Sequence, residues 1–504
     1  NGPMGRKRDF NYNQRLEYNS GSDEFDWYHM GRVDTFTKDG SYYWSPGGIY
    51  ARIEKDDSND KYIMTDRYGF KTVFHNSDDN TLEGRLWYLE DRNGNRVNLL
   101  YDGTGKLITI VDDIGREYTV RYYSHGRISE IEDFSGRLFK FGYNDAGELI
   151  TCTSPAVTGT PTENNLPNGK THWYDYNSSH QMIEKAFPGE YAADSADPTP
   201  YLVITYTSDK VTTQRYGTSG QDFEIRYDTA FAEVIDRKGF RTRTEWNSDG
   251  VVTKVRRYTG TWSFSGDTPV QDSGSKLRSG DPDYFETLYT YLTTPAYEVY
   301  STTLPRGNKI FNEYDNANDH PLSQGNVIEV RREKAGGQSG PTSISTFTTY
   351  ENTFNLPITI TDALGNETHL EYDGISWSSL VSGTPPTKGN LTERRAPDVD
   401  IGQPSTQTII TVYTYNQYGQ LLSVTDPVNK VTGYFYYGSG AGENPEGSLY
   451  QVVDDYSGFN LTSEYVYNER GAVLEIYPPR AFAAGSDKTK FGSFFTLNKL
   501  DQVI

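Results

Sequence analysis

A spacing of 21 residues constrains this chain more than any other feature of its sequence. Aspartate, glycine and tyrosine recur at that interval through three consecutive units without a gap. The positions are Asp91, Asp112 and Asp133, then Gly94, Gly115 and Gly136, then Tyr101, Tyr122 and Tyr143. A repeat of this kind is typical of stacked arrays, in which each unit buries its apolar face against its neighbours. We therefore predict one continuous array and expect its function to depend on its shape.

Each unit alternates apolar and polar side chains after its Asp-x-x-Gly turn. In one unit Val97, Leu99 and Tyr101 alternate with Arg96 and Asn98, and the two units that follow repeat the pattern. Alternation with period two predicts a strand with one buried face, whereas a helix would need a period of about 3.6. Glycine supplies the positive φ that tight turns need, and aspartate can accept hydrogen bonds from the amides that follow it. We predict two short strands per unit, of about five or six residues each.

The same offsets return further along the chain, where insertions separate the units. They are kept by Asp236, Gly239 and Trp246; by Asp362, Gly365 and Tyr372; by Asp426, Asn429 and Tyr436, with asparagine in the glycine position; and by Asp455, Gly458 and Tyr465. Segments rich in Pro, Gly, Ser and Asp interrupt the pattern, and we interpret them as loops at hairpin ends. They span residues 154–170, 188–200, 260–282, 334–345, 373–389, 397–406 and 438–447.

The order Tyr-Asp-x-x-Gly-x-Leu, then Asp-x-x-Gly-Arg and a closing Tyr, resembles the Rhs or YD repeat. Residues 91–96 (Asp-Arg-Asn-Gly-Asn-Arg) and 112–117 (Asp-Asp-Ile-Gly-Arg-Glu) carry the resemblance, and residues 11–16 resemble the stretch that opens the Rhs region in many members. Such repeats occur in bacterial Rhs proteins, in toxin-complex BC shells and in animal teneurins. The resemblance implies a β-sheet ribbon that spirals into a hollow shell. In bacterial members the shell often encloses a C-terminal toxin, and in teneurins it is an adhesion scaffold.

On this resemblance the sequence divides into three parts. Residues 1–59 are a leading segment, residues 60–477 are the repeat array with its loop insertions, and residues 478–504 are further, partial strands. The paired-aspartate core motif that ends many bacterial shells does not occur in the sequence. We expect both ends to continue into a longer protein, secreted or displayed on a bacterial surface, with its signal outside this sequence.

Composition restricts the partners that this chain can bind. A net charge of −21 and a pI of about 4.8 disfavour nucleic acid and anionic lipid. The 41 tyrosines offset a hydrophobic content of only 35%, because each buries a large ring and leaves a polar tip. The single cysteine, Cys152, excludes an internal disulfide and lies in register with Ile110 and Ile131, so we interpret it as a packed thiol. No run of about 18 apolar residues occurs, so we expect no membrane span in this segment.

The sequence lacks the patterns that usually carry chemistry. None of its seven histidines pairs with another at metal-ligand spacing. The acidic segments 56–60 and 76–80 do not match an EF-hand loop, so we interpret them as acidic turns. No Gly-rich phosphate loop and no G-x-S-x-G turn occurs. We expect no catalytic residue, no cofactor and no metal site.

These observations favour an all-β protein, a repetitive antiparallel hairpin array that forms a spiralling sheet or hollow shell. We interpret it as a structural shell or scaffold segment whose partners are an enclosed polypeptide cargo, such as a toxin domain, or other chains of the same assembly. Two alternatives stay open: an adhesin or glycan-binding surface built on the long loops, and a self-assembling fibre or coat that pairs through exposed sheet edges. Besides the repeated aspartates and glycines, the residues expected to hold the array together are Tyr101, Tyr122, Tyr143, Trp246, Tyr372 and Tyr436.

Overall fold

Nearly all strands of this chain join one antiparallel sheet that follows the order of the sequence. The computed structural model describes residues 2–76, 81–158, 165–217, 222–276, 278–293, 296–318, 320–399 and 407–504. Within them, 37 strands form the sheet, and each pairs with the next strand of the sheet along the chain. A separate hairpin consists of β23 (Trp262–Ser265) and β24 (Thr268–Gln271). The predicted all-β array of antiparallel hairpins is confirmed.

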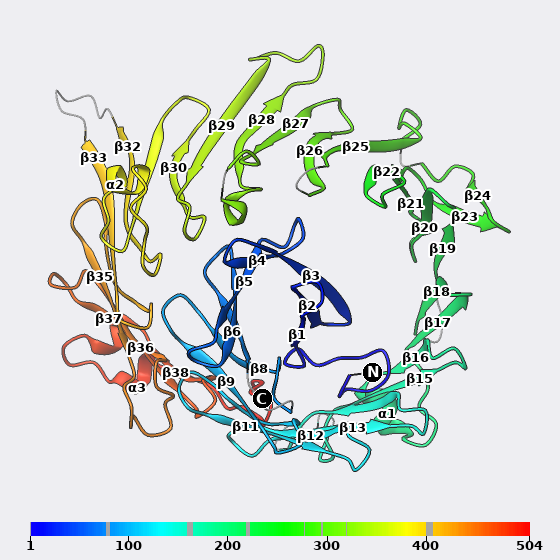
Figure 1. The fold of residues 1–504 in the computed structure, drawn as a ribbon, viewed down its shortest axis with the longest axis horizontal. Helices are drawn as coiled ribbons and strands as arrows, with labels where there is room; N and C mark the ends of the chain where they lie inside the picture. Colours follow the sequence, from blue (N-terminus) through cyan, green and yellow to red (C-terminus); the bar gives the residue numbers. More distant parts are fainter. Residues whose placement is uncertain are drawn as a thin grey trace.

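The first eight strands curl into a unit that lies inside the rest of the molecule (Figure 1). The free edge of the first strand contacts the residues that precede the eighth strand, which closes the unit. There the Leu16 amide donates to the Gly84 carbonyl over 2.8 Å, and Arg15 forms an isolated bridge with Arg85. We call this unit the inner curl. Its strands are β1 (Arg15–Asn19), β2 (Glu24–His29), β3 (Arg32–Asp39), β4 (Tyr42–Trp44), β5 (Ala51–Asp56), β6 (Lys61–Asp66), β7 (Lys71–His75) and β8 (Leu86–Glu90).

An apolar core fills the inner curl and extends to the strands that follow it. Each large side chain that it encloses stabilises the fold by about 1.5–3 kcal/mol. The inward faces of the repeat strands join the same core through Leu99, Ile110 and Val120. The regular repeats therefore pack directly on the inner curl. The core members with no exposed surface include Phe25, Phe36, Ile53, Phe74, Leu86 and Ile128.

The three regular units form six strands of five or six residues, as predicted. Ile131 lies opposite Val120 on one side and Phe139 on the other, so the predicted buried face is continuous across the strands. Arg121, Glu130 and Lys140 form the matching row on the outer face. The strands are β9 (Arg96–Tyr101), β10 (Leu107–Val111), β11 (Glu117–Tyr122), β12 (Ile128–Glu132), β13 (Leu138–Tyr143) and β14 (Leu149–Thr153).

From β9 onward the sheet runs around the inner curl as a ring (Figure 1). Both chain ends lie inside or beside this ring, and the C-terminus comes close to the repeat strands. We call the face toward the inner curl the inward face. The remaining strands are β15 (Thr171–Tyr176), β16 (Met182–Ala186), β17 (Leu202–Thr207), β18 (Lys210–Tyr216), β19 (Phe223–Tyr227), β20 (Phe231–Ile235), β21 (Arg241–Trp246), β22 (Val252–Tyr258), β25 (Tyr284–Leu292), β26 (Glu298–Thr303), β27 (Lys309–Tyr314), β28 (Val327–Glu333), β29 (Ser343–Tyr350), β30 (Pro357–Thr361), β31 (Glu367–Tyr372), β32 (Leu391–Val399), β33 (Gln407–Tyr415), β34 (Leu421–Thr425), β35 (Val431–Tyr436), β36 (Leu449–Asp454), β37 (Leu461–Tyr467), β38 (Val473–Tyr477) and β39 (Ser493–Phe494).

Some segments that we interpreted as loops contain short regular elements. Residues 260–282 include the β23–β24 hairpin, which Trp262 anchors by packing on Tyr258 with ring centroids 5.2 Å apart. Trp262 and Phe264 alternate with serines over only four residues, which is too short a pattern to identify a strand in a Ser/Gly/Asp-rich segment. Residues 400–406 lie outside the described part of the chain. The helical elements are α1 (Pro188–Ala193), η2 (Pro321–Ser323), α2 (Trp377–Val381), η3 (Pro479–Phe482) and α3 (Lys488–Phe491).

Polar contacts between loops attach the ring to the inner curl. Asn355 donates to the carbonyl of Arg67 over 2.7 Å, and the Tyr50 hydroxyl donates to Glu298 over 2.8 Å. These pairs join residues 288 and 248 positions apart in sequence. The sheet itself continues without a break through residues 59–60, and β38 pairs with β39 beyond residue 477. The division at 59 and 477 therefore stays a prediction about sequence character.

Candidate functional site: the repeat frame and the ring seam

The repeated aspartates close the turns between strands. The Oδ1 atom of Asp91 accepts the amides of Asn93 and Asn95 at 2.8 and 2.9 Å. Gly94 between them has a φ of 91°, where a glycine avoids the steric cost of a side chain. Asp112 with Gly115 and Asp133 with Gly136 repeat the arrangement. The aspartates follow β8, β10 and β12 directly, so each side chain fixes the register of the next strand.

The strand-ending tyrosines hold the backbone of an earlier strand. The Tyr101 hydroxyl donates to the carbonyl of Leu86, fifteen residues earlier, over 2.7 Å. The same contact recurs in four other predicted positions. In each hairpin the strand register shifts beside the tyrosine, so a bulge aims the ring across the ladder. These contacts join Tyr122 to Leu107, Tyr143 to Ile128, Tyr372 to Pro357 and Tyr436 to Leu421, at 2.8–2.9 Å.

Burial makes these phenols weaker acids. Burial raises the pKa of Tyr122 to about 12 and also raises the pKa of Tyr101, Tyr143 and Tyr372. Trp246 ends β21 in the same place but makes a different contact, because its indole nitrogen donates to Thr229 over 3.1 Å. The aromatic positions thus bridge neighbouring strands along the inward face.

Several other strand-ending tyrosines were not predicted from the sequence. Insertions change their distance from the preceding aspartate, so the fixed offset does not find them. The usable signal is a tyrosine followed by Asp, Glu or Asn. Hydroxyl contacts to the backbone of an earlier strand are made by Tyr176, Tyr314 and Tyr350, each of which has such a residue after it.

The last predicted unit differs from the expected pattern. Its strand ends at Tyr467, whose hydroxyl donates to Leu449 over 2.8 Å, and not at Tyr465. The turn before it is longer, and Asp455, Ser457 and Asn460 occupy the left-handed region in place of Gly458. The two extra turn residues move the closing tyrosine along the chain. The assignment of Tyr465 was therefore wrong.

Side chains near the C-terminus close the ring onto the repeats. Asp501 accepts hydrogen bonds from Arg137 at 2.9 Å, from Arg470 at 2.8 Å and from Asn468 at 2.7 Å. Lys170 donates to Gln502 over 2.8 Å. Within the described residues these side chains, and no strand pair, join the two ends of the ring. We call this set the seam.

Replacing Asp501 by alanine is expected to loosen the seam. Three charged or polar donors would lose their shared acceptor, which costs about 1–3 kcal/mol for partly buried charged hydrogen bonds. Hydrogen exchange and limited proteolysis of the C-terminal residues measure the effect. Glu469→Ala is the matched control, since Glu469 pairs with Arg470 at 2.9 Å but is 54% exposed. Equal protection of the two variants would contradict the seam.

Acid should weaken the turns and the seam together. Burial alone would raise the pKa of Asp133, but hydrogen bonds from Arg137 and Ser135 outweigh it and hold the pKa below its ordinary value. Asp501 behaves likewise through Arg470 and Asn468. A carboxyl whose pKa is lowered by folding stabilises the protein above its unfolded pKa of about 3.9, and that stability is lost as the pH falls further.

We therefore expect the free energy of unfolding to fall as the pH drops below about 4. Urea denaturation at a series of pH values measures this slope. Asp133→Asn should flatten the slope, whereas Asp145→Asn, at an exposed turn position, should keep it. An Asp133→Asn slope equal to that of the native protein would show that the turn aspartate does not carry the effect.

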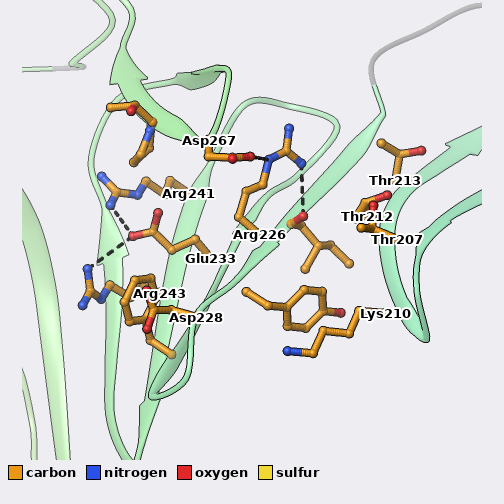
Figure 2. A pocket seen from close by; sticks show the side chains of 15 residues that line it. Thr207, Lys210, Thr212, Thr213, Arg226, Asp228, Glu233, Arg241, Arg243 and Asp267 are labelled. Carbon is orange, nitrogen blue, oxygen red and sulfur yellow. Dashed lines mark hydrogen bonds and ion pairs between the residues drawn. The ribbon is translucent and has the colours of Figure 1, made fainter.

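A cavity of about 830 Å³ lies beside the β23–β24 hairpin (Figure 2), which projects from the outer side of the ring (Figure 1). Glu233 lies between Arg241 and Arg243, and Arg226 reaches Asp267 at 3.1 Å. The carboxylates offset most of the cationic charge of the lining. Threonine hydroxyls complete a polar wall on the opposite side. The cavity can hold a polar molecule.

The first acidic turn and the single cysteine make structural contacts. Among the described residues no cluster of three or more His, Cys, Asp or Glu side chains could hold a metal ion. Asp56 accepts hydrogen bonds from Ser58 and Asn59 within its own turn. Residues 77–80 of the second acidic segment lie outside the described part. Cys152 lies opposite Phe141 and His172, and burial raises the pKa of its thiol. No helix in the described chain is long and apolar enough to cross a membrane.

Comparisons with known proteins agree with this architecture. No family model and no curated protein matches the sequence. The crystal structure of TcdB2-TccC3-TEV is similar, with a TM-score of 0.56, 13% identity and coverage of 97% of this chain and 24% of that chain. TcdB2-TccC3 without its hypervariable C-terminal region gives a TM-score of 0.55 at 12% identity, and the match covers 97% of this chain and 24% of that chain. The structure of the Photorhabdus luminescens Tc holotoxin pore gives a TM-score of 0.50 at 13% identity, and the match covers 97% of this chain and 23% of that chain.

At this identity the likeness shows the fold. The chain has an Rhs-like shell fold of the kind found in Tc toxin components, as the resemblance of its repeats implied. It spans about a quarter of the length of the structures it matches.

Proposed function

We propose that this chain is a non-enzymatic arc of a shell that encloses a polypeptide, within a secreted or surface-displayed bacterial protein. One observation carries the proposal: a single sheet runs in a ring around its own N-terminal strands and closes on itself at Asp501. A sheet that served only as a flat adhesive surface would not need this closure.

The distribution of side chains supports enclosure. Tyrosine rings and aliphatic side chains alternate along the inward face, and ion pairs cover the outer face. On the outer face Arg256 pairs with Glu286 at 2.7 Å, and Arg121 pairs with Glu130 at 2.8 Å. A charged exterior that carries many ion pairs favours solubility and disfavours edge contacts between shells. The inward face is thereby left as the surface on which a partner would act.

Protease protection tests this function. The native protein, purified without denaturant together with any polypeptide it retains, is treated with protease and analysed by mass spectrometry. We expect the retained polypeptide to resist cleavage in the intact ring and to be cleaved when Asp501→Ala opens the seam. Glu469→Ala is the control and should protect as well as the native protein. A retained polypeptide that is cleaved equally in all three proteins would overturn enclosure.

A glycan-binding role stays a prediction, and the outward cavity is the place to test it. The Tyr227 ring lines that cavity and is 40% exposed. An array of glycans that gives no binding, or binding that Tyr227→Ala leaves unchanged, would count against the adhesin alternative.

A further inference from the structure

A second cavity lies inside the ring and has a charge opposite to that of the whole chain. It has a volume of about 630 Å³ and is bounded by the N-terminal segment, the first residue of β1, the β2–β3 hairpin and Arg85, which precedes β8. The elements that line it are drawn within the ring in Figure 1. Its lining holds five cationic side chains and one carboxylate, whereas the chain has 48 basic and 69 acidic residues. The charged lining residues are Lys7, Arg8, Asp9, Arg15, Arg32 and Arg85.

Three of these cations have no carboxylate partner among the described residues. Arg15 pairs with Glu17 at 2.9 Å and Arg32 with Asp34 at 2.7 Å. Arg8 instead lies over the ring of Tyr174, with its guanidinium carbon 5.0 Å from the ring centre. Lys7 and Arg85 make no ion pair in the described structure, and Lys7 is exposed. Because these three cations have no carboxylate partner in the described structure, the cavity presents positive charge that is available to an external anion.

The inward face of the ring shows the same pattern at a distance from this cavity. Arg257, Arg332 and Arg394 are exposed and make no ion pair within the described residues. Alternation along their strands places them on the face of the strand-ending aromatics. Arg257 lies opposite Thr242, on the strand that ends at Trp246. Arg332 lies opposite Ile310, on the strand that ends at Tyr314. Arg394 lies opposite Leu370, on the strand that ends at Tyr372.

Apolar side chains accompany these cations. Phe285, opposite Arg257, is 48% exposed, and Ile344, opposite Arg332, is 43% exposed. Met30 and Val33 line the cavity and are 71% and 48% exposed. Unpaired cations beside exposed apolar groups are suited to an extended chain that carries both carboxylates and apolar side chains.

We infer that the cationic cavity binds an acidic segment of the enclosed polypeptide, with the inward arginines as secondary contacts. The inference rests on the proposed shell function and names the chemistry of its occupant. A polypeptide is favoured over nucleic acid, because a net charge of −21 repels a phosphate backbone more strongly than a peptide with a few carboxylates. The exposed apolar side chains at the cavity could contact apolar side chains of a peptide, whereas a phosphate backbone offers no apolar group for them.

The test is a titration of the full chain with a fluorescent peptide of alternating glutamate and leucine, read by anisotropy at low salt. Lys7→Gln combined with Arg85→Gln should weaken binding by about tenfold, as expected for the loss of two solvent-accessible charge contacts. The matched control combines Lys140→Gln and Lys309→Gln, which remove two exposed cations from the outer face and should leave affinity unchanged. Circular dichroism confirms that both double variants fold.

Three outcomes would overturn the inference: no binding of the acidic peptide, equal weakening by the two double variants, or tighter binding of a single-stranded oligonucleotide at the same cavity. The protease experiment above keeps the two proposals separable. Protection of a retained polypeptide without discrimination by Lys7 and Arg85 would reject the acidic occupant and leave the shell intact. Binding of the acidic peptide without any protection would reject enclosure, and with it the assignment of the occupant as cargo.

Discussion

Replacing Tyr372 by alanine is expected to lower the free energy of unfolding by about 3–5 kcal/mol, the range found when a large aromatic side chain is removed from a core. The Tyr372 ring is 5% exposed and packs with Ile358, Leu370 and Leu380. Its hydroxyl donates to the Pro357 carbonyl over 2.8 Å, so the substitution removes both the packing and a strand-bridging contact. Chemical denaturation of the purified protein measures the loss.

Tyr372→Phe separates the two contributions of this side chain. It keeps the ring and removes only the hydroxyl, so a loss of about 1 kcal/mol is expected. If the alanine variant unfolded at the same denaturant concentration as the native protein, the strand-ending tyrosines would not hold the array. If the phenylalanine variant lost as much as the alanine variant, the hydrogen bond and not the packing would dominate.

Replacing Gly84 by alanine is expected to have the second large effect, because a side chain there meets the backbone of the inner curl. A Cβ atom would lie 1.8 Å from the Leu16 carbonyl oxygen, and the φ of Gly84 is 69°. The clash would separate β1 from the residues before β8. These two segments are now joined by the hydrogen bond from the Leu16 amide to the Gly84 carbonyl. We expect a loss of about 3 kcal/mol or more, from overpacking together with left-handed strain.

Gly94→Ala is the matched control for this prediction. Gly94 has a φ of 91°, but its Cβ would meet nothing within 4 Å. Only the left-handed strain remains, which costs about 1–2 kcal/mol. Thermal unfolding of both variants gives the comparison. Losses of equal size would show that backbone conformation alone, and not closure of the inner curl, sets the need for glycine at position 84.

The regular part of the fold could be predicted because its determinants are local. Asp91, Gly94 and Tyr101 lie within eleven residues, and the structure satisfies each within one hairpin. Asn429 shows why the turn survives a substitution: it adopts a φ of 64°, a conformation that asparagine tolerates better than most residues. Where an insertion lengthened the turn before Tyr467, the same local rule failed.

The inner curl and the seam could not be predicted, because they depend on contacts between distant residues. Arg137 and Asp501 are 364 positions apart, and nothing beside either residue marks the other as its partner. The cationic cavity was hidden for the same reason, since Lys7, Arg32 and Arg85 come from three separate segments. The net charge of −21 predicts an acidic surface, not a cationic cavity. Composition sums the charges of the whole chain, whereas the fold separates acidic and basic side chains onto different surfaces.

The most direct test of the account is the distance between the two sides of the seam. Spin labels at Lys170→Cys and Gln502→Cys, with Cys152→Ser to remove the native thiol, report that distance in solution. The ring predicts one short, narrow distribution, because these side chains are in contact at 2.8 Å in the structure. A broad or long distribution for the folded protein would show an open ribbon and would contradict a closed shell arc.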